Sequence, residues 1–149
     1  MESYLALKRH LGRSINMKIT DPIADLFCRI KNAINVKSPD LVVPFSKIKL
    51  GICKILKDEG FIRSYDVVSL DLNKQSIKIV LKYAPNGSSL IKEMTRVSKC
   101  SKRVYCKKAD IPKVLGGFGI SILSTTKGIL DGKTARINNL GGELLGLVY

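Results

Sequence analysis

One short stretch of the chain, residues 124–134 (STTKGILDGKT), carries residue types that could bind phosphate or nucleic acid. Its second part, from Gly128 to Thr134, is close to the phosphate-binding loop of nucleotide-hydrolysing proteins, in which four residues separate two glycines before Lys and Ser or Thr. Here only three residues separate Gly128 from Gly132. Because the N–H groups of such a loop must wrap around one phosphate, the missing residue changes the required geometry. The spacing therefore favours a turn after a strand over a nucleotide-dependent enzyme.

The first part of the same stretch offers hydroxyl groups, a cation and a flexible backbone. Ser124, Thr125 and Thr126 each supply one hydrogen-bond donor and acceptors, and Lys127 adds a positive charge. Gly128 allows the backbone to turn tightly and to approach a partner closely. A loop of this kind can enter the shallow minor groove of RNA, where 2′-hydroxyls and base edges are exposed. Taken alone, these residues also fit an ordinary polar turn.

The overall charge indicates a polyanionic partner. The 149 residues include 26 Lys and Arg against 12 Asp and Glu, a formal net charge of +14. Such an excess repels itself in a compact fold and usually accompanies an anionic partner. No apolar run approaches the roughly 18 residues of a membrane span, and the basic residues do not gather on one amphipathic helix. We therefore expect nucleic acid as the partner, with no membrane and no small-molecule substrate.

The densest positive charge lies in residues 96–113 (RVSKCSKRVYCKKADIPK), where Lys102 and Arg103 precede an aromatic residue, Tyr105. Cations of this kind bind phosphate, and a tyrosine ring stacks on a base or sugar. The alternative is an exposed hairpin whose charges only aid solubility. The charge of the whole chain favours an RNA-binding role for all three side chains.

The cysteines and the histidine do not suggest chemistry of their own. The four cysteines, Cys28, Cys53, Cys100 and Cys106, form no C-x-x-C pair, and His10 is the only histidine, so a zinc site lacks both spacing and ligands. Cys28 and Cys53 lie on apolar helical stripes and are expected to pack as small hydrophobic side chains. The sequence predicts no catalytic residue, no metal and no cofactor, and free thiols that fit a reducing compartment.

Residues 17–83 are expected to form an α/β domain in the order helix–strand–helix–strand–strand. The first helix follows Thr20-Asp21-Pro22, which supplies a cap and a proline at the first helical position. The remaining elements are expected at residues 41–43 (strand), 46–60 (helix capped by Ser46 and closed by Gly60), 61–68 and 76–83 (strands), with a turn at 73–75.

Lysines at the start of the second helix are candidates for phosphate contacts. An apolar stripe at Ile48, Ile52 and Ile55 predicts that Lys47 and Lys49 lie on the exposed sides. A cation is unfavourable at a helix N-terminus unless an anion lies nearby. A solvated helix face is the alternative interpretation.

The second half of the chain has a different pattern. Residues 84–89 (APNGSS) are typical of a linker, and residues 90–149 are expected to form a mostly antiparallel β domain with short helices, which makes the fold α+β. Residues 1–16 form a basic N-terminal extension before Met17. It is a genuine extension, the result of an upstream start site, or an organellar presequence. Strands are expected at 91–97, 103–106, 120–123 and 143–149, and short helices at 110–115 and from Thr134 towards residue 140.

Four motifs occur in one order along the chain and resemble one family. They are TDPIADLFCRIKNA at 20–33, RVSKCSKRVY at 96–105, STTKG at 124–128 and LGGE at 140–143. Together they resemble the bacterial-type small-subunit ribosomal protein eight family over nearly all of residues 17–149. The resemblance implies a non-catalytic protein with an α/β domain and a β-rich domain. It also implies direct, early binding to the central domain of small-subunit ribosomal RNA, which helps to organise the platform.

The resemblance also implies residue roles and partners. The STTKG loop matches the RNA-binding loop of the family, so the nearby phosphate-loop pattern is accidental. Tyr105 and Glu143 match positions beside that surface, and Thr20, Arg29, Asn32 and Lys47 match positions that face RNA on the first domain. Family neighbours are small-subunit proteins five and twelve, and some members repress their own mRNA, so a free-standing translational regulator is the alternative function.

The implied location is the cytoplasmic ribosome of a bacterium, or else an organellar ribosome. Cys100-Ser101 stand where many family members have Pro-Gly, so that turn is expected to differ.

Overall fold

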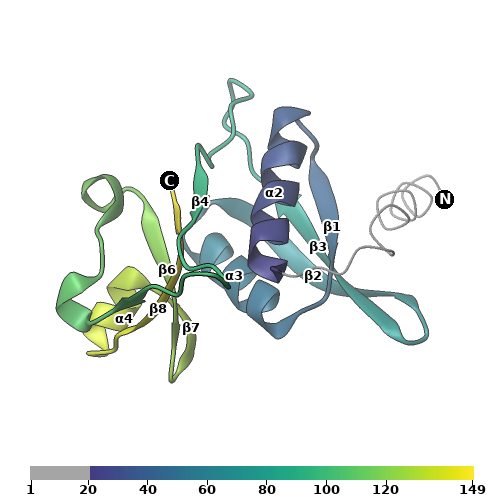
Figure 1. Ribbon diagram of the computed structural model, residues 1–149. Helices are drawn as coiled ribbons and strands as arrows, with labels where there is room; N and C mark the ends of the chain where they lie inside the picture. The colour runs from purple at the N-terminus through teal and green to yellow at the C-terminus, as the bar shows by residue number, and fades with distance from the viewer. Residues whose placement is uncertain (1–20) are drawn as a thin grey trace. The chain divides into compact units, whose positions relative to one another are not determined.

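The computed structural model describes residues 21–149, except the side chain of residue 70. These residues divide into two compact units, one that ends at Tyr83 and one that spans Ala84–Tyr149 (Figure 1). Their helices and antiparallel sheets confirm the expected α+β class. The extension at residues 1–16 and the predicted RNA contact at Thr20 lie outside the described residues.

The N-terminal unit has the expected order of helix, strand, helix and two strands. Its strands form an antiparallel sheet in the order β1-β3-β2. The turn between β2 and β3 lies at residues 72–73 instead of the predicted 73–75, because Asp71 pairs with Lys74 and extends both strands. The elements are α2 (Pro22–Asn35), β1 (Asp40–Pro44), α3 (Lys47–Asp58), β2 (Ile62–Asp71) and β3 (Lys74–Leu81).

The start of α2 forms as the sequence predicts. The Asp21 side chain accepts hydrogen bonds from the backbone N–H groups of Ile23 and Ala24, each at 3.2 Å, and Pro22 occupies the first turn. A cap of this kind stabilises a helix by about 1 kcal/mol. The stripe that α2 buries leaves Cys28 exposed, so the prediction that Cys28 packs in the core is wrong. The buried residues of α2 are Ile23, Leu26, Phe27, Ile30 and Ala33.

Helix α3 is rotated relative to the predicted stripe. Ile52 and Ile55 are buried as expected, but Ile48 is 43% exposed and Lys49 is buried in its place. Both 48 and 49 lie one turn before residue 52, so the sequence spacing alone allows either position to face the core. Cys53 is buried, as predicted.

The C-terminal unit is a mostly antiparallel β structure built around β8. In the described residues β8 pairs with β4, β5 and β6, and β6 pairs with β7. One face of this sheet packs on a core formed by Ile111, Leu123, Ala135 and Leu144. The elements are β4 (Met94–Arg96), β5 (Tyr105–Cys106), η1 (Lys108–Asp110), η2 (Val114–Gly117), β6 (Ile120–Thr125), β7 (Gly128–Asp131), α4 (Gly132–Ile137) and β8 (Gly142–Val148).

Three details of this unit differ from the sequence-based expectation. The predicted helix at 110–115 is wrong: two short 3-10 turns flank Pro112, because the residue before a proline is disfavoured in helical conformation. The strands expected at 91–97 and 103–106 shorten to β4 and β5. Residues 128–131 form a strand, and the turn that precedes them is only Thr126-Lys127.

Candidate nucleic-acid interface

The segment 124–128 forms the tip of the hairpin between β6 and β7, and we call it the hydroxyl hairpin. Thr125 pairs with Gly128 across the hairpin, and its Oγ1 donates to the Gly128 carbonyl at 2.9 Å. The same Oγ1 accepts from the Lys127 N–H at 3.2 Å. Gly128 has a φ of 102°, a conformation that glycine adopts without strain. Thr125 therefore shapes the turn, whereas Thr126 and Lys127 are exposed.

A row of side chains crosses the sheet beside this hairpin. Tyr105 of β5 lies opposite Glu143 of β8, and Glu143 lies opposite Ser124 of β6. Residues directly opposite one another in antiparallel strands present their side chains on the same face. The neighbouring pair, Leu123 and Leu144, packs in the core on the other face. The structure thus brings Tyr105, Glu143 and Ser124 together on the face that is not buried.

Two glycines allow β8 to enter between β5 and β6. A Cβ atom on Gly142 would collide with the carbonyl oxygen of Ser124, and one on Gly141 would lie 2.5 Å from the carbonyl oxygen of Cys106. A larger residue at either position would push β8 away from its neighbours. The LGGE motif therefore places Glu143 beside the hydroxyl hairpin through close backbone packing.

Glu143 is held by two donors on one of its oxygens. Ser98 Oγ donates to Glu143 Oε1 at 2.5 Å, and Arg103 Nη1 donates to the same oxygen at 2.8 Å. Ser98 is fully buried, and its Oγ also accepts from the Val104 N–H at 3.2 Å. The sequence analysis missed Ser98, because its spacing shows no sign of a partner 45 positions away.

The surroundings of Glu143 keep its carboxylate charged. Burial by itself raises the pKa of Glu143, but the hydrogen bonds from Ser98 and Arg103, with the charges of Arg103 and Arg96, outweigh burial and lower it. The hydrogen bond to Glu143 raises the pKa of Arg103 in turn. An ionised carboxylate accepts hydrogen bonds and repels phosphate, so this position suits N–H or O–H donors on a ligand.

This row contains an exposed aromatic ring and is accompanied by cations. Tyr105 is 71% exposed, and the Arg103 side chain is 48% exposed beside Glu143. Lys102 pairs with Lys99 in a tight turn whose tip is Cys100-Ser101. The arrangement offers positive charge for phosphates, a ring for stacking, and hydroxyl and carboxylate groups for hydrogen bonds.

The candidate residues of the N-terminal unit are distributed over two helices. Arg29 Nε forms an ion pair with Asp25 Oδ2 at 2.8 Å, and Asn32 lies exposed one turn further along α2. Lys47 is exposed at the first position of α3. These residues belong to the N-terminal unit, whereas the hydroxyl hairpin belongs to the C-terminal unit.

The expectation that Lys49 lies on an exposed side of its helix is wrong. Lys49 is 2% exposed, and its Nζ donates to the carbonyl oxygen of Pro44 at 3.3 Å. Burial lowers the pKa of Lys49, with the charge of Asp25 opposing and that of Arg29 adding to the effect. The amine satisfies a backbone acceptor inside the unit and is poorly placed to meet a phosphate.

The described residues show no group of three or more His, Cys, Asp or Glu side chains that could hold a metal ion. Burial raises the pKa of Cys53 to about 12 and also raises the pKa of Cys106, which keeps both thiols neutral and weakly nucleophilic. Among the helices in residues 21–149, none is long and apolar enough to cross a membrane.

Comparison with known proteins covers both units. The family model described as ribosomal protein S8 matches residues 21–149. Small ribosomal subunit protein uS8 of Xylella fastidiosa (strain M12) is 50% identical over 129 residues, which cover 87% of this chain and 97% of that protein. The uS8 protein of Streptococcus pneumoniae (strain Hungary19A-6) is 50% identical over 134 residues, which cover 89% of this chain and all of that protein.

Proposed function

The chain belongs to the ribosomal protein S8 family, and we propose that it binds the central domain of small-subunit ribosomal RNA through the face that carries the hydroxyl hairpin. The family consists of structural RNA-binding proteins of the ribosome and not of enzymes, so this chain is a structural protein whose partners are ribosomal RNA and other ribosomal proteins. More specifically, we propose that it binds the central domain early in assembly of the platform.

One observation carries the proposal: Tyr105, Glu143 and Ser124 form a continuous row that ends at the hydroxyl hairpin. Sequence-specific RNA recognition needs donors and acceptors for base edges and 2′-hydroxyls, in addition to positive charge. The row supplies an aromatic ring, a carboxylate and a hydroxyl within three adjacent strands. The carboxylate repels phosphate. This surface therefore favours a region of an RNA helix where base N–H and ribose O–H groups face the protein, and disfavours a region where only phosphates do.

The hairpin residues have different roles in this proposal. The Thr125 hydroxyl is engaged within the turn, so it positions the loop. Thr126 lies exposed at the tip and is the hydroxyl that is placed to read RNA. Lys127 and Arg103 supply charge towards phosphates, and Lys102 adds charge from its tight turn. Gly128 gives the RNA backbone close access.

The N-terminal unit makes a second contact with RNA in this proposal. Lys47 faces solvent at the start of α3, where an anion is favoured by the helix N-terminus. Arg29 and Asn32 contact RNA from α2, as does Thr20 just before it. Lys49 supports this surface from inside and does not touch the RNA, because its amine is bonded to Pro44.

We further propose neighbours and a location for the protein. The neighbours are small-subunit proteins five and twelve, and the ribosome is that of a bacterial cytoplasm, with an organellar ribosome as the alternative. The bacterial relatives support this assignment. Each is named as a small ribosomal subunit protein, and this chain matches nearly the whole length of each. Binding to its own mRNA would use the same hydroxyl hairpin.

The test combines binding and assembly. The chain should protect the central-domain fragment of small-subunit ribosomal RNA in footprinting, and it should sediment with small subunits from a gradient. Protection of the fragment without sedimentation would favour the free-standing regulator. Absence of both would contradict the proposed function.

A further inference from the structure

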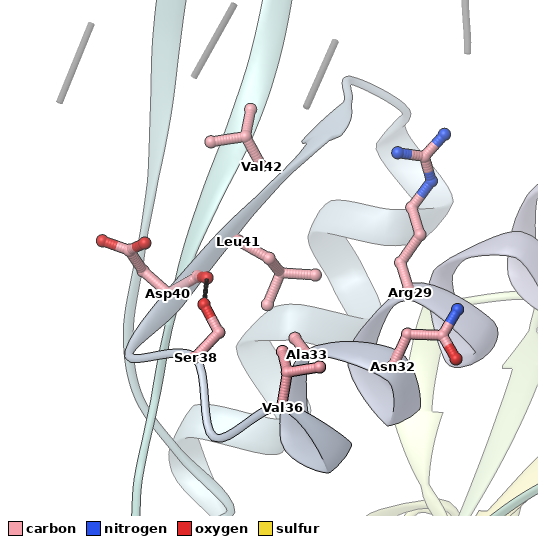
Figure 2. A pocket seen from close by; sticks show the side chains of 8 residues that line it. All are labelled: Arg29, Asn32, Ala33, Val36, Ser38, Asp40, Leu41 and Val42. Atoms are coloured by element: carbon pink, nitrogen blue, oxygen red, sulfur yellow. Dashed lines mark hydrogen bonds between the residues drawn. The ribbon is translucent and has the colours of Figure 1, made fainter. Parts of the chain in front are cut away.

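A pocket of about 480 Å³ opens in the N-terminal unit, between α2 and β1 (Figure 2). One side is a single face of α2, because its residues follow one another at helical spacing. The other side is the start of β1, an edge strand of the sheet. The volume lies within the range of small-ligand sites. The lining residues are Arg29, Asn32, Ala33 and Val36 on the helix side, and Ser38, Asp40, Leu41 and Val42 on the strand side.

The pocket combines apolar walls with hydrogen-bonding groups on one side. Ala33 on the helix side and Leu41 on the strand side line it, and both are buried in the unit. Val36 is 75% exposed at the rim, although it is apolar. A flat, apolar ligand that slides between the helix and the strand would cover this side chain and bury apolar surface.

The polar side of the pocket is formed by Arg29 and Asn32. Among residues 21–149, Arg29 bonds to Asp25 through Nε alone, so within this part of the chain the N–H groups of Nη1 and Nη2 are available to a ligand. The only contact of the Asn32 side chain among the described residues is a weak one to Cys28 Sγ at 3.7 Å. A side-chain amide presents one donor and one acceptor next to each other, which match the amino group and ring nitrogen of an adenine edge.

The acidic and hydroxyl groups of the pocket are already engaged. Asp40 Oδ2 lies 3.7 Å from Lys78 Nζ, and Figure 2 shows its carboxylate turned away from Arg29 and Asn32. Ser38 Oγ donates to the backbone carbonyl of Asp40 at 2.7 Å. A phosphate would meet one guanidinium that is already neutralised by Asp25 and an acidic neighbour, so the pocket is a poor phosphate site.

We propose that this pocket holds an unstacked nucleobase of the bound RNA, with adenine preferred. The base lies in the opening between α2 and β1 and covers the exposed side chain of Val36, Asn32 pairs with its edge, and the N–H groups of Arg29 Nη1 and Nη2 bond to the adjoining ribose. Unstacked bases are the usual targets of sequence-specific RNA recognition. The inference rests on the proposed RNA-binding function, and it assigns to the N-terminal unit a base-reading role in place of a purely electrostatic one.

The test is a pair of nuclear magnetic resonance titrations of the full chain. One uses pentaadenylate, and the other uses an abasic oligonucleotide of the same length, which keeps the phosphates and removes the bases. The backbone signals of Ala33 and Leu41 and the side-chain amide of Asn32 should shift with pentaadenylate and stay in place with the abasic chain. Equal shifts with both oligonucleotides would overturn the proposal in favour of a phosphate contact.

Two variants sharpen the test. Asn32→Asp removes the amide donor and should weaken pentaadenylate binding about tenfold, the effect of losing part of a bidentate contact to a base. Asn35→Asp adds the same charge at an exposed position of α2 outside the pocket, and it should change the affinity far less. Equal losses in the two variants would overturn base recognition. Both positions are exposed, so neither variant should unfold the unit.

The failure of this proposal is distinguishable from failure of the proposed function. If the central-domain fragment binds and depends on Thr126 while the pocket signals do not respond to pentaadenylate, the pocket proposal falls alone. If the pocket responds to pentaadenylate and the fragment does not bind, the RNA target proposed above is wrong and the base pocket stands.

Discussion

The hydroxyl of Ser98 lies 2.5 Å from the carboxylate of Glu143, although 45 positions separate the two residues in the chain. Ser98 is fully buried, and it joins the Val104 N–H to Glu143 Oε1. A buried serine thereby fixes the direction of a carboxylate on the proposed RNA face. Arg103 bonds to the same oxygen, which leaves Oε2 as the acceptor for a ligand.

Replacing Ser98 by alanine should lower stability and RNA affinity together. The substitution leaves the Val104 N–H without its acceptor and removes one donor from Glu143, so the free energy of unfolding should fall by about 1–3 kcal/mol. Urea unfolding at neutral pH measures this change. Ser101→Ala, in the exposed turn nearby, is the matched control and should be close to neutral. A Ser98→Ala protein as stable as the parent would show that the hydroxyl does not hold Glu143.

The stability of the protein should depend on the protonation of Glu143. Its pKa is lowered in the folded state, so its contribution is fully present above the unfolded pKa and is lost as pH falls through the folded pKa. Below about pH 4, thermal unfolding of the parent should therefore shift more with pH than that of Glu143→Gln, whereas the two should change in parallel between neutral pH and that point. Identical pH profiles for the two proteins would contradict the pairing with Ser98 and Arg103.

The salt dependence of RNA binding should distinguish Lys102 from Arg103. Each lost phosphate contact flattens the slope of log affinity against log salt by roughly 0.7–0.9. Lys102→Ala should flatten it by about that amount. Arg103→Ala should flatten it less, because Glu143 already neutralises part of the Arg103 charge. Filter binding over a salt series gives both slopes. A slope unchanged in both variants would show that neither Lys102 nor Arg103 contacts phosphate.

The two lysines at the start of α3 should behave in opposite ways. Lys47→Met removes an exposed charge and should weaken RNA binding with little change in stability. Lys49→Met keeps the buried stem and removes an amine whose pKa is lowered by burial, so RNA affinity should be unchanged. A lowered lysine pKa means that parent stability rises with pH above neutrality, and this rise should shrink in Lys49→Met. A loss of RNA affinity in Lys49→Met would show that Lys49 contacts RNA after all.

The sequence was informative wherever one short segment determines the structure. Asp21-Pro22 specified the start of α2, and the small residues of 124–128 specified a turn that glycine completes. It was uninformative where the outcome depends on distant partners. The orientation of α3 depends on whether Ile48 or Lys49 finds a better environment, and the Pro44 carbonyl and the charge of Asp25 both favour the amine of Lys49 inside the unit. The role of Ser98 likewise becomes visible only when β8 brings Glu143 beside it.

The hydroxyl hairpin should separate into a residue that shapes the turn and a residue that reads RNA. Thr126→Ala removes an exposed hydroxyl and should leave stability unchanged, while affinity for the central-domain fragment falls about ten- to a hundredfold, the equivalent of about 1–3 kcal/mol. Thr125→Ala removes both bonds within the turn, so it should lower stability as well as affinity. Thermal unfolding and binding measured on the same protein samples distinguish the two effects.

Lys127→Ala is the matched control for the readout by Thr126. An ammonium group senses phosphate density, whereas a hydroxyl bonds to base edges and 2′-hydroxyls. Lys127→Ala should therefore weaken binding to the central-domain fragment and to an unrelated RNA duplex by similar factors at one fixed salt concentration. Thr126→Ala should weaken binding to the fragment and leave the unrelated duplex almost unaffected. Equal losses on both RNAs for Thr126→Ala would reduce the hairpin to a polar turn that contacts RNA only through its charge.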